Sequence, residues 1–170
     1  CRVANDKGSK TTNKVTKTFN RKYQQTKFME KLINTIVGAI QDKKGKNIVS
    51  LDLTGFDGAI CSHFVICNAD STTQVAAIAD GIEEKVFEQL REKVHRIEGM
   101  NNAVWVAVDY IDVVVHIFQT ELREFYRLEE LWADAPMKKY EYELYTIMAK
   151  KNNNKQITTT KEVKEVKEVK

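Results

Sequence analysis

The chain has 170 residues, 42% hydrophobic and 30% charged, with a net charge of +3, and its single proline and seven glycines exclude a collagen-like or linker-rich class. A chain of this size and apolar content builds one hydrophobic core, and no apolar run approaches the roughly 20 residues that cross a bilayer, so no membrane association is expected. Three cysteines without a C-x-x-C motif argue against a disulfide framework and a zinc site, and for a reducing, cytoplasmic compartment.

The first third of the chain predicts a polar arm followed by a helix and two strands. Residues 1–27 are basic and aperiodic, which predicts a disordered arm. Apolar residues at helical spacing predict an amphipathic helix over 28–40, ended by three lysines and capped at Gly45. Strands are expected at 47–53 and 59–67, joined by the turn sequence TGFDG.

The middle of the chain predicts a long helix and then a hairpin. Ser71 and Gln74 have the spacing of a capping box, in which each side chain bonds the other residue's backbone amide. The apolar stripe that follows predicts a helix reaching Val94. Two apolar, β-branched segments, 105–108 and 113–118, predict strands joined by a four-residue turn.

The last third predicts a helix and then a low-complexity tail. Large apolar residues return to helical spacing after Gln119 and continue to Trp132, and Pro136 is expected to mark a boundary. Residues 137–149 are apolar enough for a further short strand or helix. The repeat that follows Lys150 fits neither period and is expected to be unfolded.

This order of elements predicts an α/β fold, with a mixed sheet of four or five strands and flanking helices. It divides the chain into a disordered basic arm (1–27), a folded domain (28–136) and a C-terminal extension with a low-complexity tail (137–170). Residues 1–27 hold eight basic residues and one acid, and residues 138–170 hold nine lysines and five glutamates, which leaves −8 on the rest. The acidic domain suits a basic protein partner, and the basic ends suit RNA phosphates.

Few residues invite a catalytic interpretation. Asp109 and Asp112 could hold magnesium for nucleotidyl transfer, but they are three residues apart, no third carboxylate has an evident place, and a solvated turn is favoured. His116 lies in an apolar strand, and Cys61 and Cys67 are interpreted as buried small hydrophobes. No glycine-rich phosphate loop is present. No catalytic residue, metal site or cofactor is therefore predicted, and a nucleotidyltransferase-like enzyme using a nucleotide and magnesium is the alternative.

The large aromatic residues offer a second kind of site. Trp105 opens a strand beside the acidic turn, where core packing and an interface are equally favoured. Tyr126 and Trp132 are expected in the core with a polar tip left for a partner, and Phe125 and Leu128 in the core. The same aromatic strip could serve a homodimer.

Three long segments carry a resemblance: LDLTGFDGAICSHFVICNADSTTQVAAIAD (51–80), WVAVDYIDVVVHIF (105–118) and ELREFYRLEELW (121–132). Over roughly residues 28–136 the chain resembles the Iojap-type ribosomal silencing factor family. The resemblance implies a mixed α/β fold similar to nucleotidyltransferases but without their catalytic set. It also implies a non-enzymatic activity: docking on ribosomal protein L-fourteen of the large ribosomal subunit, which blocks joining of the small subunit and represses translation.

The resemblance also implies a docking surface. Carried over by position, its residues are Trp105, Asp109 and Asp112, followed by Arg123, Tyr126, Glu129 and Trp132. The family commonly has Asp-Tyr at Ser62-His63, a glycine at Ala69 and a glycine at Ile111. Because a β-branched residue disfavours positive φ, the hairpin tip is expected to differ in shape from that of the family.

Overall fold

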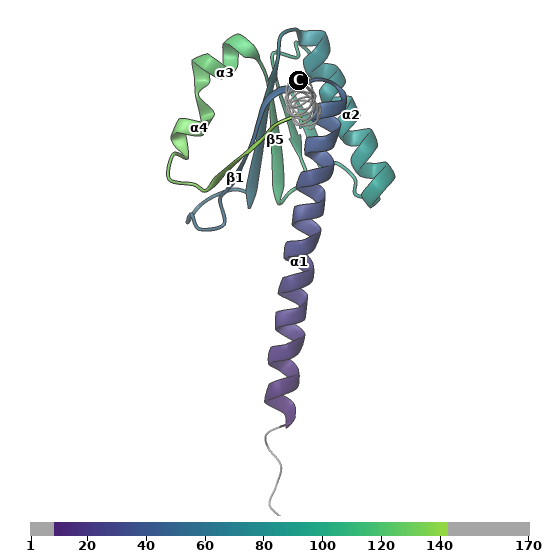
Figure 1. Ribbon diagram of the computed structural model, residues 1–170, viewed down its shortest axis with the longest axis vertical. Coiled ribbons are helices and arrows are strands. Elements are labelled where there is room, and N and C mark those ends of the chain that lie inside the picture. Colours follow the sequence, from purple (N-terminus) through teal and green to yellow (C-terminus); the bar gives the residue numbers. More distant parts are fainter. Residues whose placement is uncertain (1–8, 143–170) are drawn as a thin grey trace, which may run out of the picture.

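The computed structural model describes residues 9–142, with side chains from residue 15 onward. Its helices are α1 (Ser9–Asp42), α2 (Thr72–Leu90), α3 (Thr120–Tyr126) and α4 (Leu128–Leu131). Its strands are β1 (Lys46–Asp52), β2 (His63–Ala69), β3 (Arg96–Glu98), β4 (Trp105–Asp109), β5 (Val113–Gln119) and β6 (Met137–Tyr140). The strands form one sheet in the order β3-β4-β5-β2-β1-β6, with helices on both faces (Figure 1).

The predicted α/β fold with a mixed sheet is confirmed, although the sheet has six strands instead of four or five. β2 and β5 are parallel at the centre of the sheet, and every other pairing within the described residues is antiparallel. A short strand or helix was expected in residues 137–149, and the described part of this segment contains the strand β6. β3 was missed because a three-residue strand is too short to show a period.

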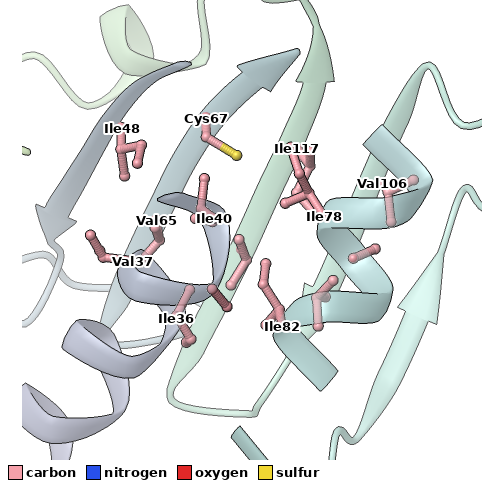
Figure 2. Packing of buried hydrophobic residues seen from close by; sticks show 14 of the residues in the cluster. Ile36, Val37, Ile40, Ile48, Val65, Cys67, Ile78, Ile82, Val106 and Ile117 are labelled. Carbon is pink, nitrogen blue, oxygen red and sulfur yellow. The ribbon is translucent and has the colours of Figure 1, made fainter. Parts of the chain in front are cut away.

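Two clusters of buried side chains fill the two faces of the sheet. On one face, α1 and α2 cover the larger cluster, in which side chains of both helices meet those of the central strands (Figure 2). On the other face, α3 and α4 cover a smaller cluster built on Leu51, Ile66 and Phe118. Strand alternation explains the division, because Val106 and Val108 face the larger cluster and their neighbours in β4 face the other side.

The prediction of a disordered arm at 1–27 is wrong for residues 9–27, which are the first half of α1. This stretch contains no glycine or proline, the two strongest helix breakers. The second half of α1 is packed on the sheet and supplies the costly nucleus, so each further residue adds one hydrogen bond to an existing helix. Figure 1 shows the first half projecting away from the sheet. Residues 1–8 and the predicted unfolded tail lie outside the described residues.

α1 ends in a Schellman motif. The Gly45 amide donates to the Ile40 carbonyl at 2.9 Å, and the Lys44 amide donates to the Gln41 carbonyl at 3.0 Å. The left-handed residue of this cap is Lys44, with φ of 60°, and not Gly45 as the sequence suggested. A glycine is still needed at 45, because a Cβ there would lie 2.3 Å from Cγ2 of Ile40.

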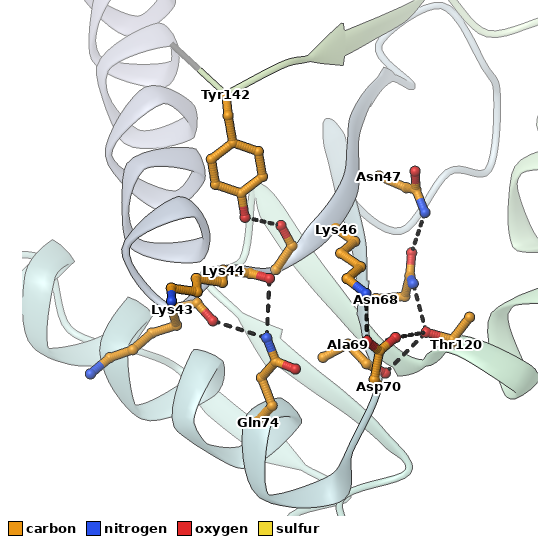
Figure 3. Close-up of polar contacts among 11 residues, drawn as sticks. Lys43, Lys44, Lys46, Asn47, Asn68, Ala69, Asp70, Gln74, Thr120 and Tyr142 are labelled. Atoms are coloured by element: carbon orange, nitrogen blue, oxygen red, sulfur yellow. Dashed lines mark hydrogen bonds and ion pairs between the residues drawn. The ribbon is translucent and has the colours of Figure 1, made fainter. Parts of the chain in front are cut away.

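The predicted capping box at α2 is half present. Oγ of Ser71 accepts the Gln74 amide at 3.2 Å, as expected. The Gln74 side chain does not reach back to Ser71; its amide group donates to the carbonyls of Lys43 and Lys44, both at 3.1 Å (Figure 3). Gln74 therefore joins the start of α2 to the end of α1 and satisfies carbonyls that the helix itself leaves unpaired.

Two helices are shorter than predicted, and a left-handed residue ends each. α2 stops at Leu90 instead of Val94, because Arg91 has φ of 55°. The helix expected to run to Trp132 is interrupted at Arg127, with φ of 46°, so that α3 and α4 are separate and meet at a corner.

Candidate docking site

Within residues 9–142, one part of the sheet is only partly covered by helices. Trp105, Ala107 and Asp109 alternate along β4 on the face opposite α1 and α2, and all three are partly exposed. Their cross-strand partners on β5 are Phe118, His116 and Val114. We call this surface the open face: it comprises these β4 residues, Asp112 at the hairpin tip, and the exposed aromatics of α3, Phe125 and Tyr126.

Trp105 is held rigidly while its indole stays partly exposed. The ring stacks on Phe118, with centroids 4.8 Å apart, and lies 5.1 Å from the Tyr126 ring. Its Nε1 donates a hydrogen bond to Nδ1 of His116 at 3.1 Å. The sequence left core and interface open for Trp105, and the geometry is compatible with either: one side of the ring is packed and the residue stays partly exposed.

His116 fixes the orientation of that indole. Burial lowers the pKa of His116 to about 4, so the imidazole is neutral at physiological pH. Because Nδ1 of His116 accepts the hydrogen bond from the indole N–H, the proton of the neutral imidazole lies on Nε2. That nitrogen is buried and has no hydrogen-bond partner in the described residues. The expectation of a core or edge histidine therefore holds, with an added role in positioning Trp105.

The two aspartates form the charged tip of the β4–β5 hairpin. Oδ1 of Asp109 accepts the backbone amide of Ile111 at 2.7 Å, which is an Asx turn. The Asp112 carbonyl accepts the amides of Ser62 and His63 at 2.9 and 3.0 Å, so its side chain is left at the surface. Across residues 9–142, no group of three or more histidine, cysteine, aspartate or glutamate side chains is arranged to hold a metal ion.

Ile111 lies between these aspartates with φ of 73°, a conformation that a β-branched residue adopts only under strain. Replacing Ile111 by glycine is expected to raise the free energy of unfolding by about 1 kcal/mol. Relief of a left-handed conformation gains about 1–2 kcal/mol, and part of it is offset by the entropy of the unfolded glycine chain. Urea denaturation measures the change.

Ile60 provides the matched control for this substitution. It is also a highly exposed isoleucine, but it is not among the residues with positive φ. Ile60→Gly is therefore expected to lower stability or leave it unchanged. A stability gain of equal size at both positions would show that the strain at Ile111 is not its source.

Arg123 and Glu129 lie inside the α3–α4 corner and away from the open face. Nε of Arg123 donates to Oε1 of Glu129 at 2.9 Å, and the two side chains are only 13% and 22% exposed. Arg123 also donates to Oδ1 of Asn68 at 2.9 Å and to the Asn47 carbonyl. These contacts bridge the helix break at Arg127 and tie α3 and α4 to the sheet.

A shallow polar cavity of about 510 Å³ lies beside this network, at the ends of the parallel strands β2 and β5. α2 and α3 leave these strands toward opposite faces, so the cavity occupies a topological switch point, where open α/β sheets bind ligands. In this cavity the polar side chains are hydrogen-bonded to one another. Asn68 donates to Thr120 and accepts from Asn47, as Figure 3 shows, and it also accepts from Arg123.

The remaining aromatic residues divide between core and surface. Trp132 packs edge-on against Phe56 and Phe64, with centroids 5.6 and 6.0 Å apart, as expected for a core residue. Tyr126, expected in the core, is 49% exposed, and Phe125, also expected there, is 76% exposed. Phe125 is thus an open-face residue that the sequence did not indicate, because a seven-residue helix does not reveal which of its sides is buried.

The two buried cysteines have no nucleophilic character. Burial raises the pKa of Cys61 to about 11 and that of Cys67 to about 12, so both thiols are protonated at physiological pH. Their interpretation as small hydrophobes agrees with this environment. Within residues 9–142, no helix is both long enough and apolar enough to cross a membrane.

Comparison with known proteins gives a family match over most of the chain. The family model described as "Ribosomal silencing factor during starvation" matches residues 26–169. The chain belongs to this ribosomal silencing factor family. The match begins close to the expected residue 28 and continues well beyond residue 136, so it includes β6.

Individual silencing factors are similar over the same region. The ribosomal silencing factor of Halalkalibacterium halodurans is 40% identical over 107 residues, which is 63% of this chain and 90% of that protein. The Bacillus subtilis factor is 39% identical over 106 residues, or 62% and 88%. A solved structure from Chromobacterium violaceum, 31% identical, covers 61% of this chain and 85% of its own length with a TM-score of 0.58.

Family membership agrees with the resemblance noted in the sequence. The names of these relatives describe ribosomal silencing factors and mention no enzymatic activity. For a silencing factor, the informative surface is one that a macromolecule can reach. Within the described residues, the open face combines a rigid indole, exposed aromatics and two carboxylates.

Proposed function

We propose that this silencing factor docks on ribosomal protein L-fourteen of the large ribosomal subunit through the open face, and that its bulk then obstructs joining of the small subunit. The main support for the proposal is Trp105, whose indole is fixed by Phe118 and His116 yet remains partly exposed, on the same side of β4 as Asp109. A side chain already held in one rotamer loses little entropy when a partner covers it. Tryptophan and tyrosine are also the residue types that most often dominate binding energy at interfaces.

Charge supports a basic partner for this face. The region between residues 28 and 137 carries a net charge of −8, and Asp109 and Asp112 place two carboxylates at the rim of the open face. Rim charges mainly steer the encounter and select the partner, whereas packed aromatic residues slow dissociation. We infer that Trp105, with Phe125 and Tyr126 beside it, supplies affinity and that the hairpin tip supplies specificity for a basic protein. Trp132, Arg123 and Glu129 hold α3 and α4 in position behind this surface.

The direct test of the proposal is a binding and subunit-joining experiment with purified components. The full chain is incubated with separated large subunits, separated small subunits and isolated L-fourteen, and binding is followed by cosedimentation or pull-down. Binding to the large subunit and to L-fourteen, with a slower light-scattering signal for subunit joining, is expected. Binding to the small subunit alone, or unimpaired joining at saturating factor, would overturn the proposal.

Neutralising the hairpin tip is expected to weaken large-subunit binding by about tenfold, mostly through a slower association rate. The double substitution Asp109→Asn and Asp112→Asn removes both charges, and asparagine at 109 keeps an Oδ1 that can accept the Ile111 amide. Association rates measured at low and high salt check the prediction, since the difference between variant and parent chain should shrink as salt rises.

The control places the same change of charge on the far side of the sheet. Asp80 and Glu84 are exposed on α2, so Asp80→Asn with Glu84→Gln alters net charge equally without touching the open face. This control is expected to bind like the parent chain. Equal losses in both double variants would mean that overall charge, and not the hairpin tip, steers the encounter.

A further inference from the structure

The projecting half of α1 has no counterpart in the matched family region, which begins at residue 26. From Val15 to Phe28 every residue is exposed. At about 1.5 Å per residue, the stretch from Ser9 to Lys27 extends roughly 28 Å along the helix axis. Figure 1 shows it extending away from the sheet and from the other helices of the described residues. A helix that builds no core requires another explanation.

The charged residues of the projecting half of α1 are all basic. Residues 9–29 contain six lysines and arginines and no aspartate or glutamate. Lys17 and Arg21 are exposed one turn apart, and the sequence continues the row backward through Lys14 and Lys10, at intervals of three and four residues. Like charges at i and i+4 destabilise an isolated helix, and no acid is present at these spacings to neutralise them. The row is therefore suited to a polyanion.

Apolar side chains gather on the other side of the same half. Val15, Phe19 and Tyr23 follow one another at intervals of four residues and are 67%, 72% and 59% exposed. On the same side of the helix, the next positions toward the core are Lys22 and Thr26, and the next apolar residue is Met29. Polar residues at these positions weaken it as a seam for a second copy of the helix. Two exposed aromatic rings, with Lys22 on their side of the helix and the row of cations on the opposite side, instead match the means by which proteins bind single-stranded nucleic acid, base stacking and phosphate contact.

We propose that residues 9–27 of α1 form an RNA-binding arm that contacts the phosphate backbone of large-subunit ribosomal RNA through Lys17 and Arg21, with Phe19 and Tyr23 against unpaired bases. This inference rests on the proposed function, which brings the chain to the large subunit. It assigns separate partners to two parts of the chain: the acidic open face contacts a basic protein, and the basic arm contacts RNA.

The test compares two double variants of the full chain that lose the same charge. Lys17→Ala with Arg21→Ala removes two arm cations, and Lys93→Ala with Lys139→Ala removes two exposed cations of the domain that lie outside the open face. The probes are protein-free large-subunit RNA and isolated L-fourteen. Binding is measured between about 50 and 200 mM salt, because each phosphate contact contributes about 0.7–0.9 to the slope of log affinity against log salt.

The arm variant is expected to bind RNA about tenfold more weakly than the parent chain, with a slope smaller by about one to two. The control should match the parent chain in both. Both variants should bind isolated L-fourteen equally well, so that failure of the arm and failure of the proposed docking are distinguishable.

Three results would overturn the arm proposal. One is equal RNA affinity and equal salt slope for the two variants. Another is binding of the parent chain to phosphatidylserine vesicles in the absence of RNA binding, which would assign the basic helix to a membrane surface. The third is a dimer in sedimentation equilibrium that becomes monomeric in a Phe19→Ser, Tyr23→Ser variant without loss of RNA binding.

Discussion

Ala107→Arg is expected to abolish large-subunit binding while leaving the fold intact. Ala107 lies at the middle of the open face, two residues from Trp105 along β4, and is partly exposed. An arginine there adds bulk at the centre of the proposed interface and places a positive charge against a basic partner. Like-charge contacts across an interface cost several kcal/mol, so affinity should fall by about 100-fold or more.

Ala133→Arg is the matched control for this substitution. Ala133 is exposed after α4, outside the open face, and the same arginine there should change affinity by less than about twofold. Urea denaturation of both variants measures whether either substitution disturbs the fold. Wild-type affinity of a folded Ala107→Arg variant would mean that L-fourteen does not contact the centre of the open face.

Arg123→Met is expected to lower the free energy of unfolding by about 3 kcal/mol, the largest stability effect predicted for a single side chain of this protein. Breaking one partner of a buried ion pair costs about 3–5 kcal/mol, and the lower end applies because Glu129 is 22% exposed. Glu129 would be left without its cation, and Asn68 and the Asn47 carbonyl would each lose a donor. Urea denaturation monitored by tryptophan fluorescence measures the change.

Arg123→Met combined with Glu129→Met should recover most of that stability, because no charge is then left unpaired. The double variant also separates two roles for the pair. If Arg123 and Glu129 only position α3 and α4, the double variant keeps large-subunit affinity within about threefold. A stable double variant that no longer binds would show that these side chains themselves touch the partner.

The elements that could be read from the sequence are those whose pattern is set by burial. β1, β2, β4 and β5 are apolar because helices or neighbouring strands cover them, and α2 shows its stripe because one side lies on the sheet. The breaks at Arg91 and Arg127 left no signal, since arginine is a good helix former and is not one of the residue types that usually take the left-handed cap position. The first half of α1 was predicted to be disordered for the opposite reason: it is helical without burying a face.

The candidate site was predictable in part. Trp105 stood out as a large aromatic residue at the start of a strand, and strand alternation places Asp109 on its side of the sheet. The internal role of Arg123 was not visible, because its partners Asn47 and Asn68 are distant in sequence. Ala107 and Phe125 also escaped notice, since nothing in a single sequence says which part of a sheet face the following helices leave uncovered.

The continuity of α1 has a mechanical consequence. The residues that project from the domain and those packed under β2 belong to one unbroken helix, Ser9–Asp42, and the second half is buried at Ile36 and Ile40. A flexible tether would fix only a maximum reach between two contacts, whereas a rigid rod fixes distance and direction together. Force applied at the tip is therefore transmitted to the sheet as torque, and α1 can set the angle at which the factor sits on its partner.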